Sequence, residues 1–535
     1  MRMLNKKTAY FVPIIAFVYI LFFTQSLPIL WEGNLFHEGF AKQNVLSLLE
    51  QTFSFKGNIL EKAEPAYGLY FKLVFKIFGY NFNGFRISKA VIFAITAMIL
   101  FKINQELFKK TQHAIIATAL SALSFPIYIH TMVLDESFII AEMYKFAAIL
   151  MFLKDIKQER TNVLHKILIL LLTIFAFKTY PPSAAIIGFF MASSFILDRK
   201  QVKKYFLLFI VLLALILPFS THLEKMSGPF GAHWENLQQV FTKDLTNNLI
   251  SPFKAIDFSE YTFRALYWKA LPNIITFFGF WTIILSLAIT AFNKYFQKQE
   301  QLETPFKLKF KKIFWLCIIW IICELPIFIY VPEPAIRYAS AIITPLSILF
   351  VSHIAKAQSL LNGKILVYSK YLLYFTIAFI ILTNLLNTFF FRALLGSDII
   401  AMDKVSQIVE KDRHNCILYA PTYAEQYVIV DKTNNNYDIK TDIKRIKATT
   451  KQEFSEQNFK EQKKQCNRLF IVQQKAITRN VLFPPIDFTK YKNMKLVKQI
   501  LGENDSFFDK FYFMLKSTFN TKNLYNEYYL WEYVE

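Results

Sequence analysis

The residues best suited to chemistry in this sequence follow its first long apolar run. His37, Glu38 and Gly39 stand at the centre of the stretch LFHEGFAKQNVL, shortly after an apolar run over residues 10–30. A carboxylate that removes a proton from an attacking hydroxyl or amine makes that group a better nucleophile. We therefore take Glu38 as the candidate general base and Glu32 as the competing acid, while His37 is either a packing neighbour or a direct participant.

A second pair of acids stands in another short polar segment. Asp135 and Glu136 precede an apolar run, so they either cap a helix and match its dipole or join Glu38 at a site. With Glu38 they could contribute to a divalent metal site, although this chemistry requires no metal. The sequence has no C-x-x-C motif, no zinc spacing and no glycine-rich nucleotide motif, which argues against ATP-driven and nucleotide-cofactor chemistry.

Isolated basic residues stand in comparable segments. Lys178 and Arg337 are the basic residues of their short polar stretches, and Arg86 begins an apolar run. Each either extends its side chain to a membrane interface or holds an anion such as a phosphate.

The composition is that of a membrane protein. Of 535 residues, 54% are hydrophobic and 17% aromatic, while 19% are charged, compared with about a quarter in soluble domains. The net charge of +22 is explained by Lys and Arg in cytoplasmic loops, so we do not expect nucleic-acid binding. The first run follows Arg2, Lys6 and Lys7 and lacks an A-x-A cleavage site, which favours an uncleaved span over a signal peptide.

Apolar runs predict an α-helical polytopic membrane protein of about eleven spans. The runs cover residues 10–30, 87–101, 114–130, 137–153, 167–180, 183–197, 205–220, 271–292, 313–331, 338–355 and 372–391. The fifth and sixth are short and flank Pro181 and Pro182, so they either cross fully or form a shallower hairpin. Basic residues concentrate in alternate loops, which the positive-inside rule places in the cytoplasm together with the N-terminus.

This orientation places residues 31–86, 131–136, 221–270 and 332–337 outside. Residues 1–391 then form the membrane domain, and residues 392–535 form a small extracytoplasmic (periplasmic) α/β domain with β-type runs at CILYAP, YVIV, RLFIVQ and YYLWEYV. Cys416 and Cys466 in this domain either form a disulfide in an oxidising compartment or stay free and buried. Residues 64–87 show helical spacing and predict an amphipathic helix at the membrane surface.

The ionisable residues inside predicted spans include Glu142, Lys145 and Glu324. Glu142 and Lys145 are three apart, which favours an intrahelical pair. Glu324 precedes Pro326 deep in the ninth span; an intramembrane acid indicates a functional site by default, but the sequence names no partner for it.

Four segments together resemble the GT-C membrane glycosyltransferases, which include the protein O-mannosyltransferases and the bacterial aminoarabinose transferases (glycosyltransferase family 39-like). HEGFAKQNVLSL resembles the family's acidic segment, with Glu38 on the second acid. EPAYGLYFKLVFKIFGYNFNGFR, FAFKTYPPSAA and AIRYASAIITPLSIL resemble the segments that follow, with Lys178 on the family's lysine and Arg337 on its arginine. The resemblance covers residues 10–355, and His37 and Glu64 depart from the family pattern.

The resemblance implies an inner-membrane glycosyltransferase. Such an enzyme moves a sugar from a polyprenyl-phosphate donor to an extracytoplasmic lipid, glycan or protein acceptor. Glu38 would act as general base with Asp135 and Glu136 at the catalytic site. Lys178, Arg337 and Arg86 would bind the donor phosphate, with supporting roles for His37, Glu64 and Tyr180. The alternative is a multi-spanning transporter or lipid flippase, and a surface-polysaccharide polymerase is a close neighbour of the first hypothesis.

Overall fold

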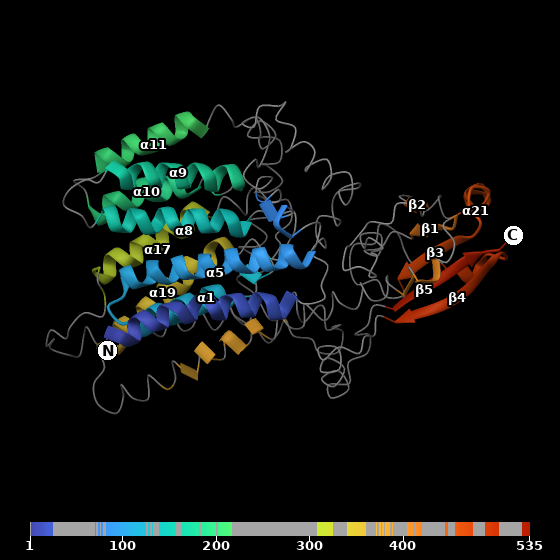
Figure 1. Cartoon of the computed structure of the whole chain (residues 1–535), viewed down its shortest axis with the longest axis horizontal. Helices are drawn as coiled ribbons and strands as arrows, with labels where there is room; N and C mark the ends of the chain where they lie inside the picture. Colours follow the sequence, from blue (N-terminus) through green and yellow to red (C-terminus); the bar gives the residue numbers. More distant parts are fainter. Residues whose placement is uncertain are drawn as a thin grey trace, which may run out of the picture.

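The computed structural model describes a helical part and a C-terminal sheet (Figure 1). The described ranges are residues 2–24, 82–124, 138–156, 163–180, 185–198, 202–216, 308–324, 340–359, 414–419, 444–447, 455–474, 487–501 and 527–534, with isolated positions within 70–78, 127–131, 183, 306, 371–388 and 404–409.

The helical part is a bundle of roughly parallel and antiparallel helices (Figure 1). Helix α8 packs against α5 and α9, α1 covers α5, and α17 packs against α10 and α19. The helices are α1 (Arg2–Thr24), α5 (Phe82–Leu107), α6 (Thr111–Ala122), α8 (Phe138–Asp155), α9 (Val163–Thr179), α10 (Ala185–Leu197), α11 (Val202–Ile216), α17 (Phe310–Glu324) and α19 (Ser340–Gln358).

Alternating helix ends meet at one end of the bundle, which we call the basic end. Asp155 at the end of α8 accepts a hydrogen bond from Tyr205 Oη of α11 (2.7 Å) and lies 3.7 Å from Lys166 Nζ of α9. Lys312 Nζ of α17 donates to the carbonyl of Leu197 at the end of α10. Exposed lysines surround these contacts, namely Lys109, Lys110, Lys154, Lys203, Lys309 and Lys311.

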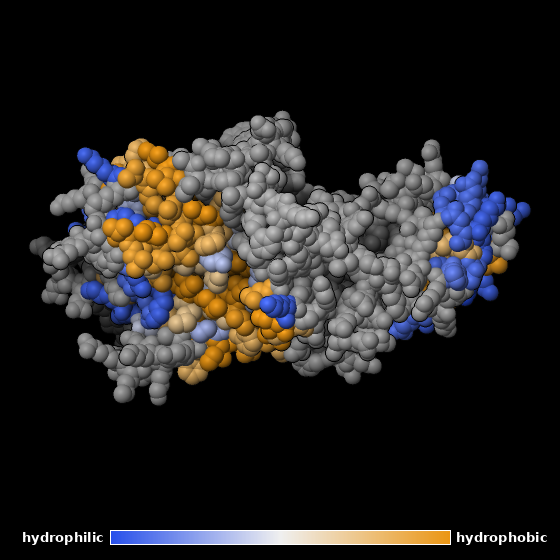
Figure 2. Space-filling model, turned by 45° about the horizontal axis from the view of Figure 1, so that its top comes forward, coloured by the Kyte–Doolittle hydropathy of each residue, from blue (hydrophilic) through white to orange (hydrophobic). Residues whose placement is uncertain are grey.

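The surface of the helical part is apolar along the helices and hydrophilic mainly at one end (Figure 2). An apolar face extends over the helices, and most hydrophilic residues of the helical part gather at its left end (Figure 2). Exposed apolar side chains on this part include Ile14, Val91, Ile95, Leu171 and Phe206. An exposed apolar surface of this extent is typical of a protein that contacts a partner or a membrane.

The helices occupy the apolar runs that the sequence marks as spans. Helices α8, α10 and α19 begin within two residues of the predicted limits, whereas the predicted span 271–292 lies outside the described residues. Within the described part, one helical stretch, Arg86–Leu107 of α5, is long and apolar enough to cross a bilayer by length and composition. The stretches Phe11–Phe22, Val163–Phe177, Ala185–Leu197 and Ser340–Lys356 are apolar but shorter. The eleven-span arrangement therefore remains a prediction.

Helices α9 and α10 together reach both ends of the bundle. Lys166 near the start of α9 lies beside the end of α8, and Tyr180 just past the end of α9 contacts Phe138 at the start of α8 (ring centroids 6.1 Å apart). Helix α10 then returns, since Leu197 at its end meets Lys312 at the basic end. The hairpin thus reaches both ends of the described bundle, and full crossing of a bilayer by these two helices stays a prediction.

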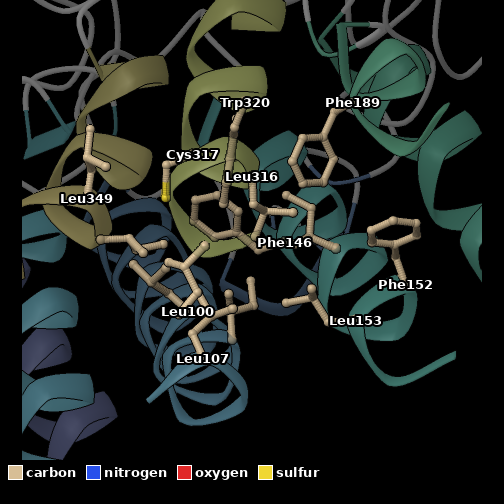
Figure 3. Close-up of a cluster of buried hydrophobic side chains, with 14 of the residues drawn as sticks. Leu100, Leu107, Phe146, Phe152, Leu153, Phe189, Leu316, Cys317, Trp320 and Leu349 are labelled. Atoms are coloured by element: carbon tan, nitrogen blue, oxygen red, sulfur yellow. The ribbon is translucent and has the colours of Figure 1, made fainter. Parts of the chain in front are cut away.

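Aromatic side chains fill the interior between these helices (Figure 3). The Phe152 ring of α8 lies 4.9 Å from the Tyr205 ring and 5.1 Å from the Phe190 ring, and the Trp320 ring of α17 lies 5.4 Å from that of Phe189. Since lipid tails are as apolar as these side chains, close packing rather than burial from water would hold such helices together in a bilayer.

The C-terminal part contains a five-stranded mixed sheet in the order β2-β1-β3-β5-β4. Strands β1 and β2 and strands β1 and β3 are parallel, whereas β5 is antiparallel to both β3 and β4. Helix α21 (Glu456–Lys463) and a 3-10 turn, η11 (Phe488–Lys490), pack on one face through Phe459 and Phe488. The strands are β1 (Cys416–Tyr419), β2 (Lys444–Lys447), β3 (Leu469–Gln474), β4 (Met494–Leu501) and β5 (Glu527–Tyr533).

A disulfide and a salt bridge connect elements of this sheet. Cys416 of β1 and Cys466 after α21 form a disulfide with their Cα atoms 5.6 Å apart, which decides between the two alternatives for these cysteines. Arg468 binds Glu532 of β5 through two hydrogen bonds of 2.6 Å each. These hydrogen bonds lower the pKa of the Glu532 carboxyl below its ordinary value.

Candidate functional site

The end of the bundle opposite the basic end carries buried cations at the start of α5. Arg86 and Lys89 are three residues apart on α5 and are 6% and 2% exposed. Lys102, which lies toward the basic end of the same helix, is sixteen residues from Arg86, about 24 Å along the axis. Two cationic side chains on one face of a helix, within its first two turns, favour an anionic group nearby.

Arg86 is thus the predicted cation whose side-chain burial the structure describes. Lys89 was not singled out by the sequence, because it stands inside an apolar run and resembles a residue that extends to the interface. The signal that could have found it is the Arg86-x-x-Lys89 spacing, which places both side chains on one face.

The start of α8 and the end of α9 meet at this opposite end. The Tyr180 ring packs edge-on against Phe138, and the Tyr180 amide donates to the carbonyl of Ala176 (2.9 Å). In the sequence, Phe138 follows Asp135 and Glu136 closely, and Tyr180 follows Lys178 by two residues.

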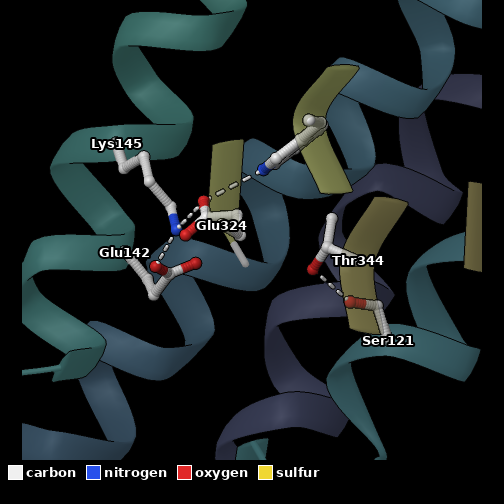
Figure 4. A network of polar contacts seen from close by, with 6 residues as sticks. Ser121, Glu142, Lys145, Glu324 and Thr344 are labelled. Atoms are coloured by element: carbon white, nitrogen blue, oxygen red, sulfur yellow. Dashed lines mark hydrogen bonds and ion pairs between the residues drawn. The ribbon is translucent and has the colours of Figure 1, made fainter. Parts of the chain in front are cut away.

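A buried ionic cluster lies inside the bundle toward the same end. Glu142 and Lys145 of α8 pair with one another, and Lys145 Nζ also donates to Glu324 Oε1 of α17 at 2.7 Å (Figure 4). Trp320 Nε1 donates to the same Glu324 oxygen at 3.2 Å. The three ionisable residues are between 1% and 4% exposed. We call Glu142, Lys145 and Glu324 the buried triad.

The triad combines two carboxylates with one ammonium group. With all three ionised, the site carries one net negative charge away from water, where an uncompensated charge is costly. Such a site either takes up a proton or cation or holds a nearby positive group. Glu142 lies about 6 Å along the axis of α8 from Phe138, the first residue of that helix. The triad is therefore closer to the opposite end of the bundle than to the basic end.

The triad supplies the partner for Glu324 that the sequence does not name. The Glu142–Lys145 pair agrees with the interpretation of their spacing, but the ammonium is shared between two helices. No spacing signal links residue 145 with residue 324, because they come together through the packing of the bundle.

A hydrogen bond joins two further helices near this cluster. Ser121 Oγ of α6 and Thr344 Oγ1 of α19 lie 2.7 Å apart and are both buried (Figure 4). Polar contacts of this kind join helices whose surroundings are otherwise apolar.

Most of the predicted site residues fall outside the described part of the chain. Lys178 lies in α9, but its side chain is not among those described. Within the described residues, no group of three or more His, Cys, Asp and Glu side chains is arranged to hold a metal ion. A metal site with Glu38 and the other predicted acids stays a prediction, because the residues concerned lie elsewhere. Those outside are His37, Glu38, Glu64, Asp135, Glu136 and Arg337.

Comparison with known proteins assigns no family. No protein-family model matches the chain, and no curated protein matches it. The functional argument therefore depends on the residues themselves.

Proposed function

We propose that this protein is an integral membrane glycosyltransferase that uses a polyprenyl-phosphate sugar donor. The two-ended bundle is the observation that supports the membrane placement. Exposed lysines gather at the basic end, while buried Arg86 and Lys89 lie at the opposite end. By the positive-inside rule, the basic end faces the cytoplasm and the opposite end faces outward.

The disulfide supports the same orientation. Cys416 and Cys466 are linked in the C-terminal sheet, and such bonds persist mainly in oxidising compartments outside the cytoplasm. The orientation predicted from the loop charges also places this sheet outside, so two independent features agree.

Sugar transfer itself is proposed from the order of the motifs. Glu38 would remove the proton from the acceptor nucleophile as it attacks the sugar carbon, and the bond to the lipid phosphate would break. Cationic side chains would stabilise the charge on the departing phosphate. In the proposed orientation, Arg86 and Lys89 are suited to this task at the outward end, and Lys178 and Arg337 remain the further candidates from the sequence.

The proposal is tested in two steps. First, cysteines introduced at exposed Lys76 and Lys110, in a background without Cys317 and Cys323, are treated with an impermeant maleimide. Labelling from outside at position 76 but not at position 110 supports the orientation, and the reverse result overturns it.

The second step measures the reaction. Membranes containing Glu38→Gln are supplied with radiolabelled polyprenyl-phosphate sugar, beside Glu32→Gln for the competing acid and Glu50→Gln as a matched acid of the same loop. Loss of transfer in Glu38→Gln alone, at equal expression, supports the base role. Unaltered transfer in Glu38→Gln refutes it.

A transporter is the second candidate, and the buried triad is the observation that favours it. Ionisable residues inside membrane helices often form proton or ion relays. Reconstituted vesicles distinguish the two functions, because a transporter or flippase moves its substrate across the bilayer without labelling an acceptor.

A further inference from the structure

A cavity of about 430 Å³ lies between α1, α5 and α8. Its volume falls in the range of small-molecule sites. On α1 it is lined by Pro13, Ile14 and Phe17, and on α8 by Leu150. On α5 a single stripe at helical spacing lines it, consisting of Val91, Ala94, Ile95, Met98, Ile99 and Lys102.

The cavity is an apolar groove with one charged end. Every lining residue except Lys102 is apolar. Ile14 is 56% exposed, and Val91 and Ile95 are 43% and 45% exposed, so the groove opens on the apolar surface of the bundle. The short side chain of Ala94 leaves room at its floor between longer neighbours.

Lys102 places a positive charge where the groove reaches the basic end. Its ammonium donates to Gln105 Oε1 (3.1 Å) and lies 6.0 Å from the centre of the Phe101 ring. An ammonium has three N–H donors, so this hydrogen bond leaves capacity for an anion. Lys154 lies four residues after Leu150 on α8, on the same side of that helix, and adds to the positive potential.

The length of the groove matches one leaflet of a bilayer. From Val91 to Lys102 the helix rises about 16 Å, and half of a hydrocarbon core is about 15 Å. A chain lying in the groove would thus extend from the level of the cytoplasmic headgroups to the middle of the membrane.

We infer that this groove binds one acyl chain of an anionic phospholipid of the cytoplasmic leaflet, with its phosphate on Lys102. The inference uses the proposed membrane placement but does not depend on sugar transfer. The lipid would be a structural ligand away from the reaction, because its headgroup would lie at the basic end and the proposed site lies at the opposite end.

The test uses the full-length protein reconstituted with a trace of phosphatidylglycerol that carries a photoreactive group in its acyl chain, or with the matching phosphatidylcholine. We expect adducts on the peptides that contain residues 13–17 and 91–102. Ala94→Phe fills the groove and should remove these adducts, whereas Leu171→Phe, on exposed α9, should leave them unchanged. Adducts spread evenly over all exposed apolar helices, or unchanged in Ala94→Phe, would overturn the inference.

The charge is tested separately with variants that leave the groove intact. Lys102→Gln should lower the preference for phosphatidylglycerol over phosphatidylcholine by about fivefold, the contribution of one basic residue near an anionic headgroup. Lys110→Gln, at the same end but outside the groove, should keep the preference. An equal loss in both variants, or adducts abolished by inorganic phosphate alone, would contradict a lipid held at Lys102. Each of these outcomes is independent of whether Glu38 is required for transfer.

Discussion

Replacing Lys145 with methionine removes the single cation of the buried triad while keeping an unbranched side chain that is one heavy atom shorter. Glu142 and Glu324 then face one another inside the bundle without the ammonium that now lies between them. Either carboxylate must lose its charge or the helices must separate, so α8 and α17 should no longer pack as they do in the intact protein.

The magnitude follows from the geometry of the cluster. At 2.7 Å, the attraction between Lys145 and Glu324 is about 6 kcal/mol with an effective dielectric constant of 20. Removal of these charges from water offsets much of this attraction, and deletion of one partner of a buried pair costs about 3–5 kcal/mol. We therefore expect Lys145→Met to lower the free energy of unfolding by that amount.

The two acids should behave differently from the lysine. Glu324→Gln leaves Lys145 paired with Glu142, and the amide oxygen still accepts from Lys145 and Trp320, so the cost should be about 1 kcal/mol or less. Glu142→Gln is the matched single variant on α8. The double variant E142Q/E324Q leaves the ammonium without an acid of the triad and should again cost about 3–5 kcal/mol, well above the sum of the single variants.

Thermal melting of the detergent-solubilised full-length chain, followed by size-exclusion fluorescence, measures these differences. A loss of 3 kcal/mol or more should lower Tm by a few degrees, since about 1 kcal/mol corresponds to about 2–4 °C in a domain of 150–250 residues and to less in a larger domain. Equal melting of Lys145→Met and the parent protein would refute the reasoning. A double variant whose loss equals the sum of the single losses would refute the shared role of the ammonium.

Three further outcomes are expected. Cys466→Ser opens the link to Cys416, which closes a loop of 50 residues; it should destabilise the sheet by about 4 kcal/mol and make it sensitive to protease without reductant. Glu532→Gln removes the pair with Arg468. Because the folded pKa of Glu532 is lowered, its stabilisation is present above the unfolded pKa and is lost as pH falls through the folded pKa. For this partly exposed pair, the variant should thus cost about 0.5–1 kcal/mol at neutral pH and less in acid, measured by pulse proteolysis. Thr344→Val removes the hydrogen bond between α6 and α19 and should lower the unfolding free energy by about 0.6 kcal/mol, measured by the same melting assay.

Apolar runs locate helices well because twenty such residues in sequence have few alternatives to a helix. The run predicted for residues 183–197 is helical from Ala185 to Leu197. The buried triad was not predictable, because its two helices are 179 residues apart in the chain between Lys145 and Glu324. Their contact depends on how the whole bundle packs, and local spacing carries no information about that.

The sequence predicted only some of the strands of the C-terminal sheet. The run CILYAP contains β1, and RLFIVQ and YYLWEYV contain all but one residue of β3 and of β5; these are the three inner strands of the described sheet. The strands missed by the sequence, β2 (KRIK) and β4 (MKLVKQIL), lie at its two edges. Edge strands commonly carry lysines that discourage pairing with other chains, and these residues conceal the apolar pattern of an inner strand. The predicted run YVIV lies outside the described residues.

Strand β5 lies between β3 and β4, although it follows both in the chain. During synthesis, β4 therefore has no neighbour among the described strands until residues 527–533 have been made and, in the proposed orientation, exported. A stop codon anywhere between 502 and 526 would remove a central strand rather than trim an edge. It would leave the backbone of β3 exposed on one side and β4 without a place to bind, so even short truncations should behave as failures of the whole sheet.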